Sequence, residues 1–221
     1  GSDTFTISTA GSAGAAYTIA AIQSNDVEKV YVNAYDTDNT ADGIVVDMTL
    51  FKGVTNVGIA SGSATGDVHF NNMGNVVDLD INNASGDVKL TYTAAAALGA
   101  TTQNIALNNV TGTAGGAGDI TIAGVETVNI SSNTLKSELN SLVIASATTM
   151  NVTGDKDLTI DNTALNFADT TATAASAIDG TINASSFTGK LKVAVNAADN
   201  MSITGGSGND TFIMAAGMNG Y

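Results

Sequence analysis

A glycine-rich stretch near the C-terminal end of the sequence has the residue types and spacing of a cation-binding loop. Its glycines would let backbone carbonyls turn toward an ion, Asp210 would add a carboxylate, and Phe212 would fill the core of the following strand. Calcium takes six to eight oxygen ligands, so a second loop would have to complete the shell. The alternative is a glycine turn that binds nothing. The stretch, with its first six residues as the candidate ligands, reads Gly205, Gly206, Ser207, Gly208, Asn209, Asp210, Thr211, Phe212 and Ile213.

A second candidate cation loop contains three carboxylates, Asp36, Asp38 and Asp42, and closes on Gly43. Carboxylates this close repel one another unless a cation or solvent screens them. We therefore expect either a calcium loop or a solvated turn between two strands. Repeated Gly-Asp pairs could likewise form a column of ligands along one edge of the fold, although such residues more often make Asx turns. Their aspartates are Asp67, Asp87, Asp119 and Asp155.

Composition excludes several other kinds of site. The sequence has no Cys, and all seven basic residues are lysines, so it offers no disulfide, no thiolate metal site and no arginine clamp for phosphate. A net charge of −14 disfavours nucleic acid as a partner. His69 is the single histidine, and no apolar run is long enough to insert in a membrane. Asp78 and Asp80 alternate with apolar residues and form a conceivable glycosidase pair, but polar-out patterning explains them equally well, so we predict no enzymatic activity.

The elements that would position these residues are short strands. Val57–Ile59 overlays on Val77–Leu79 at a shift of 20 residues, and Gly66–Phe70 overlays on Gly86–Leu90 at the same shift. Apolar residues alternate with polar or small ones in each strand, and Gly, Asn, Ser, Thr and Asp lie between the strands. This pattern predicts an all-β parallel β-helix, or β-solenoid, of about 20 residues per turn. An antiparallel β-sandwich is the alternative.

The first 53 residues show longer alternating segments, which we interpret as an N-terminal β region that caps the solenoid of residues 54–221. The expected inward side chains of its last strand are Ile44, Val46, Met48 and Leu50. Within the solenoid, residues 94–98 could form a short helix or a packed loop. Residues 135–139 could form one helical turn because Leu135 and Leu139 are four positions apart.

Three segments carry a family resemblance: Val125–Ile130, Thr148–Gly154 and the stretch from Gly205 to Ile213. The last matches all nine positions of the G-G-x-G-x-D-x-U-x calcium-binding repeat. The chain therefore resembles the S-layer and related RTX-type surface proteins of Gram-negative bacteria, although only one complete nonapeptide is present where the family usually has a row. The resemblance implies type I secretion, calcium-driven folding outside the cell and assembly into a surface lattice.

The sequence thus predicts a structural fragment of an extracellular cell-surface protein, stabilised by Ca²⁺ and associating with neighbouring copies of itself in an S-layer. An RTX adhesin or a carbohydrate-binding module, with cell-surface polysaccharide as its partner, is the alternative function. A β-helix polysaccharide-degrading enzyme ranks below both.

Overall fold

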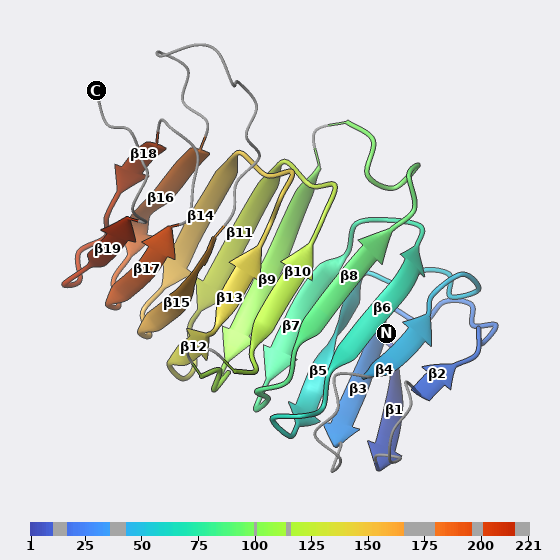
Figure 1. Cartoon of the computed structure of the whole chain (residues 1–221). Coiled ribbons are helices and arrows are strands. Elements are labelled where there is room, and N and C mark those ends of the chain that lie inside the picture. Colours follow the sequence, from blue (N-terminus) through green and yellow to red (C-terminus); the bar gives the residue numbers. More distant parts are fainter. Residues whose placement is uncertain are drawn as a thin grey trace.

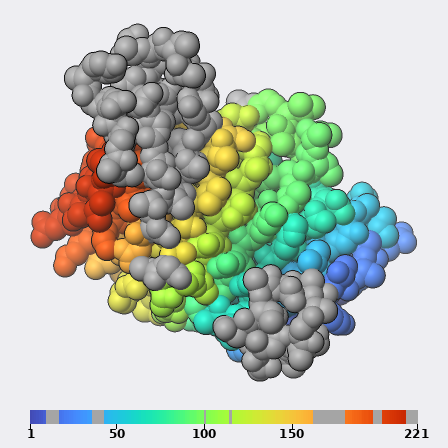
Figure 2. All heavy atoms as spheres, viewed as in Figure 1, coloured from blue at the N-terminus to red at the C-terminus, as the bar shows by residue number. Residues whose placement is uncertain are grey.

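The computed structural model describes residues 1–10, 17–35, 43–99, 101–113, 116–165, 180–195 and 201–214. The strands stack in two layers from the N-terminal to the C-terminal end (Figure 1), and all the strand pairings in these residues are parallel. The colour bands of Figure 2 follow the sequence across the molecule, as expected when each turn lies on the one before. The predicted parallel β-solenoid is confirmed, and the antiparallel sandwich is excluded.

One layer is a single nine-stranded sheet that runs the length of the described structure. Its strands, in spatial order, are β1 (Thr4–Ala10), β3 (Lys29–Tyr35), β5 (Asn56–Gly62), β7 (Asp78–Asn82), β9 (Thr102–Asn108), β11 (Thr127–Ser132), β14 (Thr149–Gly154), β16 (Gly180–Phe187) and β18 (Met201–Thr204).

The opposite layer consists of a six-stranded sheet followed by a four-stranded sheet. The six-stranded sheet contains β2 (Tyr17–Ile19), β4 (Ile44–Asp47), β6 (Val68–Met73), β8 (Val88–Tyr92), β10 (Asp119–Ile122) and β13 (Ser141–Val143). The four-stranded sheet contains β12 (Ser137–Leu139), β15 (Leu158–Leu165), β17 (Leu191–Val195) and β19 (Thr211–Met214).

The core lies between the two layers as columns of stacked aliphatic side chains. One column of the nine-stranded sheet is fully buried from β3 to β14, and neighbouring members differ by little more than a methyl group. Because every turn adds one residue to each column, no turn can bury its apolar face without its neighbours. The column consists of Val30, Val57, Leu79, Ile105, Ile130 and Val152.

The number of residues per turn varies along the solenoid, whereas the sequence predicted a nearly constant repeat of about 20. Val68 pairs with Val88, which confirms the 20-residue shift between β6 and β8. Val57, however, pairs with Leu79 rather than with Val77, because β5 is two residues longer than β7. Over the whole structure, paired residues are between 19 (Lys192 with Thr211) and 33 (Leu158 with Leu191) positions apart. Part of this variation lies within the strands, because the register shifts in the pairings β3–β5, β6–β8, β14–β16 and β15–β17.

The strands before residue 53 join the same sheets as the strands after it. β3 pairs with β5, and β4 pairs with β6, so the pairing crosses residue 53 without a change of sheet. In the segment that follows β4, Leu50 is 42% exposed, and Phe51 takes the buried position instead. The inward alternation that was predicted from Ile44 to Leu50 is therefore wrong at its last member, because the chain turns at Thr49 and Leu50.

Neither of the two segments for which a helix was one possibility forms a helix, and residues 94–98 follow the loop alternative. Residues 94–97 form a turn, and residues 137–139 form the short strand β12. Leu135 is 49% exposed, whereas Leu139 is buried, so the two leucines do not share a face. Here the spacing of four residues arises because Leu135 lies in an exposed corner and Leu139 lies in the strand that follows it. The described residues contain no helix long and apolar enough to cross a membrane.

Candidate functional site

The glycine-rich nonapeptide, residues 205–213, forms the corner between β18 and β19. Its glycines allow close contact with the preceding turn. A Cβ atom on Gly206 would lie 2.1 Å from the carbonyl oxygen of Phe187, and one on Gly208 would lie 2.0 Å from that of Gly189. Any side chain at these two positions would therefore push the corner off the turn beneath it.

Asp210 uses both carboxylate oxygens to hold this corner in place. Its Oδ2 accepts a hydrogen bond from the Gly206 backbone N–H at 2.7 Å. Its Oδ1 accepts one from the Leu191 backbone N–H, in the preceding turn, at 3.0 Å. Phe212 packs against the core, as predicted, while Ser207 and Asn209 are exposed. The aspartate therefore joins one turn to the next.

The described residues do not by themselves complete a calcium shell at this corner. Asp210 is the one acidic residue of the nonapeptide, and calcium takes six to eight oxygens. No three His, Asp or Glu side chains in the described part of the chain gather closely enough to share a metal ion. The residues fit calcium only as a partial donor set, formed by one carboxylate and nearby backbone carbonyls. The other predicted loop, with Asp36, Asp38 and Asp42, lies outside the described residues.

Three of the four repeated Gly-Asp pairs stack along one corner of the six-stranded sheet, which we call the aspartate column (Asp67, Asp87 and Asp119). Asp67 Oδ1 accepts the Asp87 backbone N–H at 2.7 Å. Asp87 Oδ1 accepts the backbone N–H groups of Gly118 and Asp119, each at 2.9 Å. The carboxylates of Asp67 and Asp87 thus cap backbone amides of the next turn. Of the two arrangements that the sequence left open, a column of cation ligands or separate Asx turns, the structure shows a column of three aspartates, two of which act as backbone caps.

Burial, and to a smaller extent like charge, disfavours the ionised form of the Asp87 carboxyl in the column. Burial raises the pKa of the Asp87 carboxyl, and the neighbouring Asp119 carboxylate adds to the rise, against the lowering effect of the backbone donors. Asp119 itself accepts a hydrogen bond from Asn140 Nδ2 at 2.6 Å. Asp155, the fourth predicted member, lies instead at an exposed corner after β14, where it pairs with Lys156 at 2.6 Å.

The outer face of the nine-stranded sheet carries a ladder of asparagines that sequence reasoning missed. Asn151 Nδ2 donates to Asn129 Oδ1 at 2.8 Å, and Asn129 Nδ2 donates to Asn104 Oδ1 at 2.9 Å. Asn104 Nδ2 then donates to Asp78 Oδ1 at 2.8 Å. The signal was present in the sequence as a Thr-x-Asn triplet at residues 102, 127, 149 and 181, but its spacing is irregular.

The pair Asp78 and Asp80 lies on this same outer face, beside the ladder. Asp80 Oδ2 accepts hydrogen bonds from the Tyr31 hydroxyl at 2.5 Å and from Asn56 Nδ2 at 3.1 Å. The Tyr31 ring reaches Asp80 by lying over Gly58, where a Cβ atom would come within 2.9 Å of the ring. Burial, followed by the hydrogen bond to Asp80, raises the pKa of Tyr31, which keeps its hydroxyl a donor.

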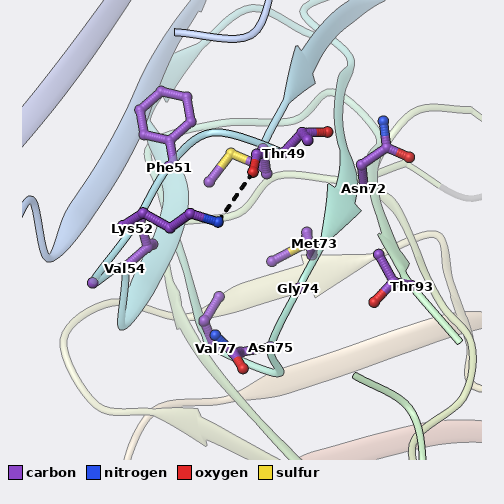
Figure 3. A pocket seen from close by; sticks show the side chains of 12 residues that line it. Thr49, Phe51, Lys52, Val54, Asn72, Met73, Gly74, Asn75, Val77 and Thr93 are labelled. Atoms are coloured by element: carbon purple, nitrogen blue, oxygen red, sulfur yellow. Dashed lines mark hydrogen bonds between the residues drawn. The ribbon is translucent and has the colours of Figure 1, made fainter. Parts of the chain in front are cut away.

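A notch of about 430 Å³ opens in the edge of the solenoid (Figure 3). It forms because the connection from β6 to β7 spans only residues 74–77, whereas the connections before and after it, residues 48–55 and 93–101, are longer. Met48, Met73 and Val77 form an apolar floor, and Lys52 reaches over it to the Thr49 carbonyl oxygen at 3.4 Å.

Comparison with known proteins identifies no relative: no family model, no curated protein and no solved structure matches this chain. Function must therefore be argued from the chain's own geometry.

Proposed function

We propose that this chain is a structural segment of an extracellular bacterial surface protein, of the S-layer or RTX type, that associates with copies of itself in a lattice. The observation that supports the proposal best is that acidic side chains at the corners form hydrogen bonds between successive turns of the solenoid. Asp67, Asp87 and Asp210 each accept backbone amides of an adjacent turn. These carboxylates stabilise the stacking of the turns, which is the role expected of polar side chains in a structural protein.

Calcium is the second part of the proposal. The nine-position match of Gly205–Ile213 to the calcium-binding repeat supports it. The Asp210 oxygens each accept one hydrogen bond, so lone pairs remain for a cation, with Gly205, Gly206, Ser207, Gly208 and Asn209 contributing backbone oxygens. Bound calcium would neutralise the carboxylate and stabilise the folded state by mass action. Asp36, Asp38 and Asp42 form the second proposed calcium loop.

Thermal unfolding tests the calcium part. In millimolar calcium we expect a higher Tm than in excess EDTA, because an ion held at 100 times its Kd contributes about 2.7 kcal/mol to stability. Asp210→Asn should reduce this rise in Tm. Asp155→Asn, which removes the same charge from an exposed corner, should keep it. Equal Tm values of the wild-type chain in calcium and in EDTA would contradict the calcium part.

Electron microscopy of the purified chain tests the lattice part independently. We expect ordered two-dimensional arrays in calcium-containing buffer, and their loss in EDTA. A chain that stays monomeric at high protein concentration in calcium, as measured by sedimentation, would contradict lattice assembly while leaving the calcium result intact.

A further inference from the structure

We propose that the outer face of the nine-stranded sheet binds a neutral, extended oligosaccharide in a hollow beside Ala106. The hollow exists because one outward-facing column has a short side chain at that position. Asp80 in β7, Ala106 in β9, Ser131 in β11 and Thr153 in β14 occupy equivalent positions of adjacent strands. The methyl group of Ala106 leaves space between longer polar neighbours.

The hollow has the size and direction of a short chain of sugar rings. It has a volume of about 320 Å³ and reaches from Asp78 and Asp80 to Thr153, across four strands. At about 4.8 Å per strand its length is about 14 Å, which exceeds a single ring. A second hollow of about 280 Å³ shares Asp80, Ala106 and Ser131 with the first and continues toward Asn133 and Thr134. The two together form a groove on the sheet.

The groove offers fixed hydrogen-bonding groups of the kind that vicinal hydroxyls need. Tyr31 and Asn56 hold Asp80 through Oδ2, and its Oδ1 accepts no hydrogen bond from the described residues. Asn104 holds Asp78 through Oδ1 in the same manner, and Asp78 also lines the groove. Because these side chains are already ordered by their neighbours, binding would cost little further side-chain entropy.

Charge and an aromatic ring narrow the ligand class. The residues that line the two hollows include two carboxylates and no lysine, so an anionic glycan would be repelled. The Tyr31 ring lies over Gly58, in the same outward column as Asp80 and beyond the residues that line the hollows. A sugar chain that extends past Asp80 would meet the apolar surface of this ring with its C–H groups. A neutral oligosaccharide satisfies both conditions. This inference goes beyond the structural role proposed above and does not depend on lattice assembly or on calcium.

Titration of the ¹⁵N-labelled chain with cellohexaose, chitohexaose and α-1,6-linked mannohexaose tests the proposal. We expect at least one of these probes to bind, with amide shifts concentrated in β7, β9 and β11. Ala106→Leu, which fills the hollow from an exposed position, should weaken binding about tenfold. Tyr31→Phe should weaken it less, since it keeps the ring and loses the hydroxyl that holds Asp80.

The matched control is Thr121→Leu, which places the same side chain on the outward face of β10 in the opposite layer. It should leave the affinity unchanged, and both leucine variants should keep the wild-type Tm. The proposal is overturned if no probe binds at a concentration of 10 mM, since a Kd above roughly 10 mM would not indicate a specific site. It is also overturned if Ala106→Leu binds as the wild type does, or if the shifts lie outside the nine-stranded sheet.

Discussion

The corner at Asp87 and the corner at Asp210 contain the same chemistry in different sequence settings. In both, a carboxylate accepts two backbone N–H groups, at least one of them from an adjacent turn. Asp210 belongs to a nine-residue calcium motif, whereas Asp87 follows a single glycine. Asp87 stacks between Asp67 and Asp119, while Asp210 has Leu191 beneath it. The motif therefore does not distinguish a metal ligand from a backbone cap, and the neighbouring turns decide how each carboxylate is stabilised.

The largest expected effect comes from Gly66, which lies in the turn next to the Asp87 corner and directly contacts Gly86. Gly66→Ala should destabilise the chain by about 3 kcal/mol or more, because the new Cβ would lie 2.0 Å from the Ala34 carbonyl oxygen. Urea unfolding measures the change. Gly74→Ala is the control, since nothing lies within 4 Å of its Cβ position, and it should change stability by less than about 0.5 kcal/mol. Equal effects of the two substitutions would show that the close approach at Gly66 has no energetic role.

Removing the carboxylate of Asp87 should have the next largest effect. Asp87→Ala leaves the backbone N–H groups of Gly118 and Asp119 without their acceptor, and we expect a loss of about 2 kcal/mol in the free energy of unfolding. Asp87→Asn keeps an acceptor oxygen and should recover most of that loss. If the alanine and asparagine variants are equally stable in urea, the carboxylate does not act as a cap.

The same kind of glycine clash should matter less at the nonapeptide corner. Gly206→Ala should cost about 1 to 2 kcal/mol, because β19 is largely exposed and can shift away from the Phe187 carbonyl oxygen. Hydrogen exchange should show faster exchange of the β19 amides in this variant, with β6 amides unchanged. Acceleration that reaches β6 would mean that the two corners unfold as one cooperative unit.

The smallest expected effect is a pH dependence of stability at the Asp87 corner. The pKa of Asp87 is raised in the folded chain, so its ionised form is disfavoured there relative to the unfolded chain. This unfavourable contribution is fully present above the folded-state pKa and disappears as the pH falls below the ordinary Asp value of about 3.9. The stability of Asp87→Asn relative to the wild type should therefore decrease as the pH is lowered, in unfolding measured between pH 7 and 3.5. A relative stability that increases on acidification would contradict the cause assigned to the shift.

The alternation of side chains predicted the strands, and the recurrence of two strands at a shift of 20 residues favoured the parallel solenoid over an antiparallel sandwich, which shows the same alternation. Pairs such as Ile120 with Ile122 and Leu158 with Ile160 are buried as expected. Register could not be predicted to the residue, because strand lengths differ and bulges interrupt the pairing, as the pairing of Val57 with Leu79 shows.

The candidate sites were predicted less completely than the fold. The aspartate column was visible as Gly-Asp pairs, but the sequence could not show that Asp155 falls at a different corner, since this depends on the length of each turn. The hollow beside Ala106 has no sequence motif. It depends on Asp80, Ala106 and Ser131, which are far apart in sequence and become neighbours only when three turns are in register.

The asparagine ladder gives the solenoid a direction. From Asn151 to Asp78, every amide donates toward the N-terminal end, so the dipoles of these side chains add along the axis and terminate on a carboxylate. A whole coil inserted between β7 and β14 would continue this chain of side-chain hydrogen bonds only if it carried an asparagine at the same register. A coil added without such an asparagine would interrupt the ladder, so the solenoid can lengthen here without a break in the ladder only by coils that contain one.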